Sequence, residues 1–96
     1  MSTLWMEIKI CRRMTRAGVI VKRDKEELYF YRHGDGYPSG LGIDLLNCLN
    51  FDEFDLFSII SKCCLQSVDS IPGGIEYLYT IDLDNKTFLL DASYRY

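Results

Sequence analysis

Short segments that alternate apolar and polar residues, or that concentrate β-branched residues, recur along the chain and predict β-strands. Five segments have this character: residues 6–10, 19–21, 27–33, 75–83 and 87–92. Within the third segment aromatic rings fall on both faces, with Phe30 on one face and Tyr31 on the other. Because a strand with rings on both faces is typical of the interior of a sheet, we expect this strand to be central.

Apolar residues at helical spacing predict two helices between the third and fourth strands. The first helix is expected to begin near Gly40, with Ser39 as its N-cap. The second is expected to begin at Asn50, where Glu53 completes a capping-box pattern. The predicted core-facing positions are Ile43, Leu45, Leu46 and Leu49 in the first helix, and Leu56, Ile59, Ile60, Cys63 and Cys64 in the second.

The predicted order of elements is therefore βββ-αα-ββ, with tight turns between most of the strands. This order favours an α+β fold in which a small antiparallel sheet of about five strands carries the helices on one face. A chain of 96 residues is long enough for one hydrophobic core, so we expect residues 1–96 to form a single domain.

The cysteines and the N-terminal segment indicate the cellular compartment in which the protein is expected. The cysteines are Cys11, Cys48, Cys63 and Cys64. Their spacing is not that of a disulfide framework, so we expect free thiols in a reducing, cytoplasmic compartment. A single histidine and the lack of a Cys-x-x-Cys pair argue against zinc, and we expect no metal or other cofactor. The sequence has no signal-peptide pattern and no apolar stretch of ~18 residues, so we expect no membrane partner.

Charge is distributed unevenly along the chain. Residues 1–33 carry eight Lys and Arg against four acidic residues, a net charge of +4, whereas residues 34–96 carry three against ten, a net charge of −7. The candidate phosphate-contacting residues are Arg12, Arg13 and Arg16, to which a nucleic-acid surface would add Lys22 and Arg23. A solvated charged turn is the commoner role for such residues. The overall net charge of −3 also argues against a nucleic-acid partner.

Four glycines and a proline in residues 34–42 predict a shaped loop after the third strand. At the strand end the side chains of Arg32 and His33 should project to opposite faces, and a glycine-rich backbone before a helix can bind an anion. The candidate ligand- or partner-binding residues are Arg32, His33, Asp35, Tyr37, Gly40 and Gly42. The structural alternative is that Asp35 orients His33 or accepts backbone N–H groups of its own turn, while Tyr37 and Pro38 pack at the core edge.

The same segment resembles parts of two families. Arg32-His33-Gly34 is similar to the opening of the histidine phosphatases, but their mechanism needs a second histidine and this chain has one. With no other catalytic set in the sequence, we expect no enzyme activity. Residues 31–38, Tyr-Arg-His-Gly-Asp-Gly-Tyr-Pro, resemble the Tyr-Arg-His-x-Asp-Gly-Tyr-Pro segment of short, mostly uncharacterised phage, prophage and bacterial proteins. This second resemblance implies an origin in a mobile element, and we therefore expect the protein to act in the cytoplasm of a host cell.

These observations lead to one principal functional hypothesis and two alternatives. The principal hypothesis is a non-enzymatic binding protein of phage or mobile-element origin that engages a host protein, as a counter-defence factor that inhibits host immunity. Exposed strand edges would also allow the chain to pair with itself as a homodimer. The alternatives are a small-molecule or nucleotide binder that uses the Arg32–Gly42 loop, and a nucleic-acid-binding accessory protein that uses the basic N-terminal third.

Overall fold

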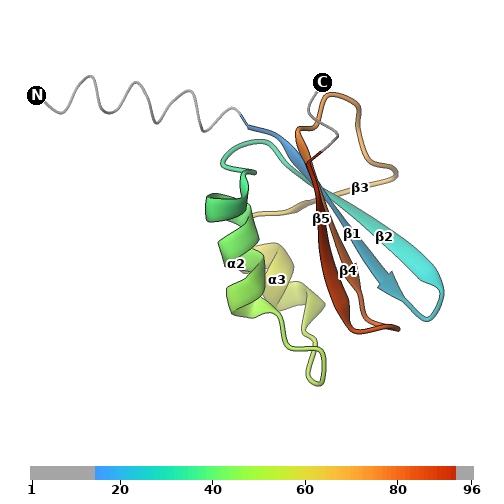
Figure 1. Cartoon of the computed structure of the whole chain (residues 1–96). Helices are drawn as coiled ribbons and strands as arrows, with labels where there is room; N and C mark the ends of the chain where they lie inside the picture. Colours follow the sequence, from blue (N-terminus) through green and yellow to red (C-terminus); the bar gives the residue numbers. More distant parts are fainter. Residues whose placement is uncertain (1–14, 93–96) are drawn as a thin grey trace, which may run out of the picture.

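A computed structural model describes residues 15–92 of the chain. In chain order its elements are β1 (Ala17–Arg23), β2 (Glu26–Arg32), the π-helical turn η1 (Pro38–Gly42), α2 (Ile43–Cys48), α3 (Leu56–Lys62), β3 (Gln66–Val68), β4 (Tyr77–Asp82) and β5 (Thr87–Asp91). The helices lie together against one face of the sheet (Figure 1). The predicted strand at residues 6–10 lies outside the described residues, as do Arg12 and Arg13.

The five strands form one mixed sheet in the order β3-β2-β1-β4-β5. β1 pairs with β2 in the antiparallel sense but with β4 in the parallel sense, and the two outer pairs are antiparallel. The α+β class with helices on one face is thus confirmed, whereas the prediction of a wholly antiparallel sheet is wrong for the β1–β4 pair. β2 lies between two strands, as the rings on both of its faces predicted. The three-residue strand β3 was not predicted, because so short a segment shows no alternation.

The core lies between the sheet and the helices. In β1 and β4 alternate side chains face this layer and are almost wholly buried. They include Val19 and Val21 of β1 and Tyr79 and Ile81 of β4. The helical side contributes Leu41, Leu45, Ile59 and Cys63 to the same cluster. Both layers therefore follow the periodicity of their own secondary structure, two along the strands and about 3.6 along the helices.

The first helical region is less regular than the sequence pattern predicts. A π-helical turn, η1, precedes α2, and Ser39 lies inside that turn, whose N-cap position is Tyr37. In α2 Leu45 is buried, but Ile43 and Leu46 are exposed. The prediction of Ser39 as the N-cap is therefore wrong. The buried stripe of α2 is also narrower than expected, because this helix spans six residues and Leu45 is the one that is buried.

The start of α3 also differs from the prediction. Asn50 does not begin the helix; its side-chain oxygen accepts hydrogen bonds from the backbone N–H groups of Asp52 and Glu53, at 3.0 and 3.2 Å, in the preceding turn. The N-cap is Asp55, whose carboxylate accepts a hydrogen bond from the N–H of Ser58 at 3.2 Å. Asn and Asp are both favoured at the N-cap position, and α3 begins after Asp55, the one that directly precedes the apolar stripe.

The end of α3 is set by a left-handed residue. Cys64 has φ 54°, and the N–H of Leu65 donates to the carbonyl of Ile60 at 3.0 Å, which is the Schellman arrangement. Cys63 is buried whereas Cys64 is exposed. The prediction that both cysteines face the core is therefore wrong for Cys64, which turns the chain toward β3.

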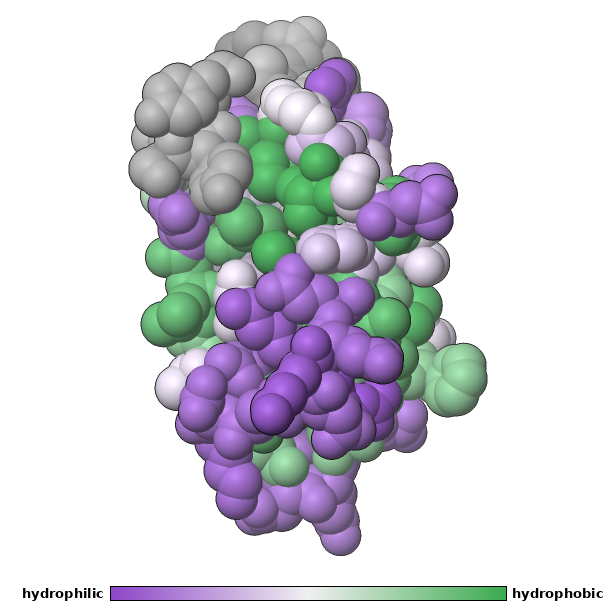
Figure 2. Space-filling view, turned by 90° about the vertical axis from the view of Figure 1, so that its right-hand side faces the viewer, coloured by the Kyte–Doolittle hydropathy of each residue, from purple (hydrophilic) through white to green (hydrophobic). Residues whose placement is uncertain are grey.

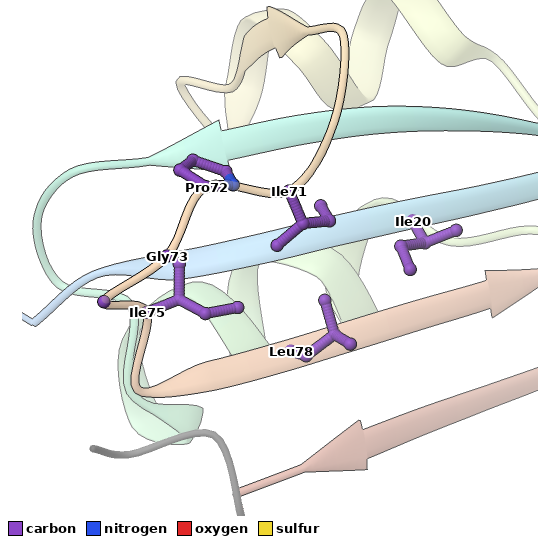
Figure 3. Close-up of a pocket in the computed structure, with 7 residues that line it drawn as sticks. Ile20, Ile71, Pro72, Gly73, Ile75 and Leu78 are labelled. Atoms are coloured by element: carbon purple, nitrogen blue, oxygen red, sulfur yellow. The ribbon is translucent and has the colours of Figure 1, made fainter.

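We call the face of the sheet that is turned away from the helices the open face. The β3–β4 connection, residues 69–76, crosses it, because β3 pairs outside β2 while β4 pairs with β1 (Figure 3). Gly18 of β1 makes the close approach possible, since a Cβ there would lie 3.1 Å from two side-chain atoms of Ile71. Part of the open face is thus covered by an apolar connection and not by a helix.

Candidate functional site

Arg32 ends β2 and points to the helical side of the sheet. Its Nε donates to the carbonyl of Gly34 at 2.8 Å, and its Nη1 donates to the carboxylate of Asp44 and the carbonyl of Cys63, both at 3.1 Å. The arginine side chain is 15% exposed. Its guanidinium therefore ties the end of β2 to both helices, which is a structural role.

The loop after Arg32 is held by its own hydrogen bonds. Asp35 has φ 54°; its carboxylate accepts from the hydroxyl of Tyr37 at 3.1 Å, and its carbonyl accepts from the N–H of Leu41 at 2.9 Å. The buried hydroxyl of Tyr79 donates to the carbonyl of Gly36 at 2.6 Å. Burial raises the pKa of that hydroxyl well above its usual range, so it remains a donor at neutral pH.

Gly40 and Gly42 serve the shape of this loop. The N–H groups of both residues donate to the carbonyl of Tyr37, at 2.9 and 3.5 Å. A Cβ on Gly40 would lie 2.5 Å from the carbonyl oxygen of Asp35, so a larger residue there would displace backbone. Two of the N–H groups expected to face an anion are therefore used inside the loop.

His33 lies on the other side of the sheet from Arg32, as strand alternation predicts. Its Nδ1 shares a hydrogen bond of 2.9 Å with the hydroxyl of Tyr31, and the two ring centroids are 6.1 Å apart. Tyr31 is in register with Gly18 of β1, the glycine over which Ile71 lies. The Tyr31–His33 pair therefore belongs to the open face, close to the β3–β4 connection.

An apolar cleft of about 400 Å³ opens between this connection and the sheet (Figure 3). It is lined by Ile20 of β1, Leu78 of β4 and five residues from 71 to 75, namely Ile71, Pro72, Gly73, Gly74 and Ile75. Ile75 and Leu78 are buried but lie outside the main core cluster. The connection thus builds a second, smaller apolar cluster on the open face, and sequence reasoning missed it.

The two halves of the open face differ in polarity (Figure 2). The half that bears the β3–β4 connection is mainly hydrophobic, and the half toward the hairpin turns is hydrophilic. In the hydrophilic half Lys22 and Glu27 form an exposed ion pair with an N–O distance of 3.7 Å. At the turns the carboxylate of Asp84 accepts from the N–H groups of Asp24 and Lys25, at 2.9 and 3.1 Å. A partner at this face would therefore meet an apolar cleft bordered by charge.

Of the three predicted phosphate-contacting residues, the structure describes Arg16. Its Nη1 reaches the rim of the cleft, 3.6 Å from the position that a Cβ on Gly74 would take. Lys22 and Arg23 lie at the other end of β1, about 20 Å away along a strand that rises about 3.3 Å per residue, and the Arg23 guanidinium lies 5.7 Å from the centroid of the Phe54 ring. Arg16 therefore does not share one surface with Lys22 and Arg23.

The buried thiol of Cys63 offers little nucleophilic chemistry at neutral pH. Burial, and then the neighbouring Cys48, raise the pKa of the Cys63 thiol to about 12, and a protonated thiol is a poor nucleophile. Within residues 15–92 no group of three His, Cys, Asp or Glu side chains is placed to hold a metal ion. In the same part of the chain no helix is long and apolar enough to cross a bilayer.

The fold and the site define the described part of the chain as an α+β domain with an apolar cleft on the open face of a mixed sheet. No family model matches the chain, and neither the curated proteins nor the solved structures gave a match. The proposal for its function therefore rests on the site's own geometry and on the segment at residues 31–38.

Proposed function

We propose that this chain is a non-enzymatic protein of phage or mobile-element origin that binds a host protein in the cytoplasm and acts as a counter-defence factor. The observation that supports the binding role is the apolar cleft between Ile71 and Leu78. Pockets that accept an apolar anchor residue are where protein–protein interfaces concentrate their binding energy. The mobile-element origin and the counter-defence role rest on the resemblance at residues 31–38 alone.

The cleft and its rim suggest the chemistry of the partner. A volume of about 400 Å³ falls in the ~300–1,000 Å³ range of small binding pockets and suits one or two large apolar side chains. Arg16 places a cation at the rim, and the Tyr31–His33 pair offers rings and hydrogen-bonding groups nearby. We therefore expect a partner segment with a large aliphatic or aromatic residue flanked by a carboxylate.

The two alternatives have less support. A ligand site in the Arg32–Gly42 loop would use a guanidinium and N–H groups that donate to Gly34, Asp44 and Tyr37 inside the protein. A nucleic-acid surface would need its cations on one face. Of the predicted set, Arg16 precedes β1, whereas Lys22 and Arg23 lie at the other end of that strand.

Site-specific photo-crosslinking in a bacterial host lysate tests the proposal. Benzoylphenylalanine is placed at Ile71, at the cleft, and in a matched variant at Phe57, which is 83% exposed on α3. The captured protein is then purified and titrated against the wild type, Ile71→Lys and Phe57→Lys. We expect a stoichiometric crosslink from position 71 but not from position 57, and a loss of affinity of about tenfold or more for Ile71→Lys, because a charge would enter an apolar cleft.

Folding is checked by circular dichroism and urea unfolding for each variant. The proposal is wrong if no saturable partner is captured from position 71, or if Ile71→Lys and Phe57→Lys bind the purified partner equally well while both are folded. A nucleotide that raises the melting temperature of the wild type but not that of a folded Arg32→Lys variant would instead support the loop alternative.

A further inference from the structure

The two edges of the sheet are protected to very different extents. Sheet edges are usually blunted by short strands, charges, prolines or bulges. β3, at one edge, has three residues. β5, at the other edge, has five residues, pairs with β4 in an unbroken register, and has the uncharged centre Phe88-Leu89-Leu90. Within residues 15–92 no strand lies outside β5.

The apolar residues of β5 are exposed on both faces of the sheet. Leu89 is in register with Thr80 and faces the open side, and it is 61% exposed. Leu90 is in register with Tyr79 and faces the helical side, yet it is 43% exposed. A strand added beside β5 would cover both leucines at once. Pairing of this edge with another strand is therefore favoured over its exposure to water.

From this edge we infer that β5 pairs with β5 of a second copy, in an antiparallel sense, about a two-fold axis through Leu89. In that register Leu89 faces Leu89 of the second copy, Phe88 faces Leu90, and Thr87 faces Asp91. Apolar residues then meet apolar residues, and the carboxylate meets a hydroxyl. Moving the axis to Leu90 would set Leu89 against Asp91, so charge and polarity both select the first register.

The resulting dimer has one continuous sheet of ten described strands, because a closed two-fold contact uses the same edge twice. Opposed residues in an antiparallel pair point to the same face, so the helices of both copies lie on one side and both open faces on the other. Five paired residues make a small interface, and interfaces below about 1,200 Å² are typical of weak association. We therefore expect a reversible dimer that depends on concentration.

Sedimentation velocity of the full chain over a wide concentration range tests this inference. The variants are Leu90→Lys, which places a charge at the edge on the helical side, and the matched control Leu46→Lys, at a leucine of α2 that is 52% exposed. We expect the wild type and Leu46→Lys to shift from monomer to dimer together, and Leu90→Lys to need at least tenfold more protein. Hydrogen exchange should show slower exchange of β5 amides as the wild-type concentration rises.

A wild type that stays monomeric throughout, or a dimer that Leu90→Lys leaves unchanged, would overturn the inference. Protection of β5 only after a purified partner protein is added would also overturn it, since the edge would then take a partner's strand. This inference is independent of the proposed function, because Leu90 faces away from the cleft and each surface is tested with its own variant.

Discussion

Gly36→Ala is predicted to destabilise the protein strongly, because the backbone of Gly36 is packed against the start of β1. A Cβ at this position would lie 2.7 Å from the Cβ of Ala17 and 3.0 Å from the carbonyl oxygen of Thr15. Ordinary contacts begin at 3.4 Å, so the loop would have to move by about 0.7 Å. Both neighbours belong to the entry into a central strand, so the movement falls on the loop.

That movement has two costs. Overpacking of this kind costs about 1–3 kcal/mol. The shift would also stretch the hydrogen bond from the N–H of Gly36 to the carbonyl of Thr15, now 3.1 Å, and such a bond contributes about 1 kcal/mol. We therefore expect the free energy of unfolding to fall by about 2–4 kcal/mol, a large part of the ~5–15 kcal/mol typical of a domain.

Urea unfolding followed by circular dichroism measures this change. The matched control is Gly73→Ala, since no described atom lies within 4 Å of the position of its Cβ; it should be neutral or stabilising by up to about 1 kcal/mol. Ala17→Gly in the Gly36→Ala background removes the shortest contact, so the two losses should couple by about 1 kcal/mol or more. A Gly36→Ala protein within about 0.5 kcal/mol of the wild type, the usual range for surface substitutions, would refute the packing of this loop.

Arg32→Met should lower the free energy of unfolding by about 2–3 kcal/mol in the same assay. It removes three hydrogen bonds and leaves two backbone carbonyls and the carboxylate of Asp44 without this donor. Lys22→Met, which breaks an exposed ion pair, should cost less than about 1 kcal/mol, and equal losses would contradict the anchoring role of Arg32. For Cys63 the folded-state pKa of about 12 lies above the ordinary 9.0, so its contribution to stability is complete below pH 9 and is lost as pH rises toward about 12. The urea midpoint of the wild type should therefore fall over this range more steeply than that of Cys63→Ala, and parallel profiles would contradict the raised pKa.

The parts of the fold that were predicted from sequence depend on local pattern. β1 and β4 correspond to the β-branched run at residues 19–21 and the alternation at residues 75–83. Successive side chains of a strand point to opposite faces, so a strand with one buried face has an apolar residue at every second position. The same alternation correctly placed Arg32 and His33 on opposite sides of the sheet. The structural interpretation of the loop is confirmed only in that Asp35 forms hydrogen bonds inside the loop. Its carboxylate accepts from the hydroxyl of Tyr37, the N–H of Leu41 donates to its backbone carbonyl, and His33 bonds to Tyr31.

The parts that were not predicted depend on where distant segments meet. The parallel pairing of β1 with β4 follows from the path of residues 69–76 across the open face, and the alternation of apolar and polar residues within the strands does not encode that path. A signal for it was present in Gly18, which interrupts a buried strand where a Cβ would meet Ile71 and Leu78. Glycine inside a strand often marks the close approach of another segment, and two isoleucines flank Pro72-Gly73-Gly74. Read together, these features point to the cleft.

The cleft and the β5 edge are adjacent, and this relation bears on how the protein would act. Leu89 is in register with Thr80, two residues along β4 from Leu78 of the cleft, on the same face. In the inferred dimer both clefts therefore open on one side of a continuous sheet and can engage two sites of a symmetric or clustered partner. Linked sites of this kind raise the overall affinity without new contacts, so a weak dimer and a small cleft together can bind more tightly than either does alone. Leu90 lies on the helical side and Ile71 at the cleft. Substitution of Leu90 should therefore remove the gain in affinity that comes from dimerisation, whereas substitution of Ile71 should weaken the binding of each single cleft.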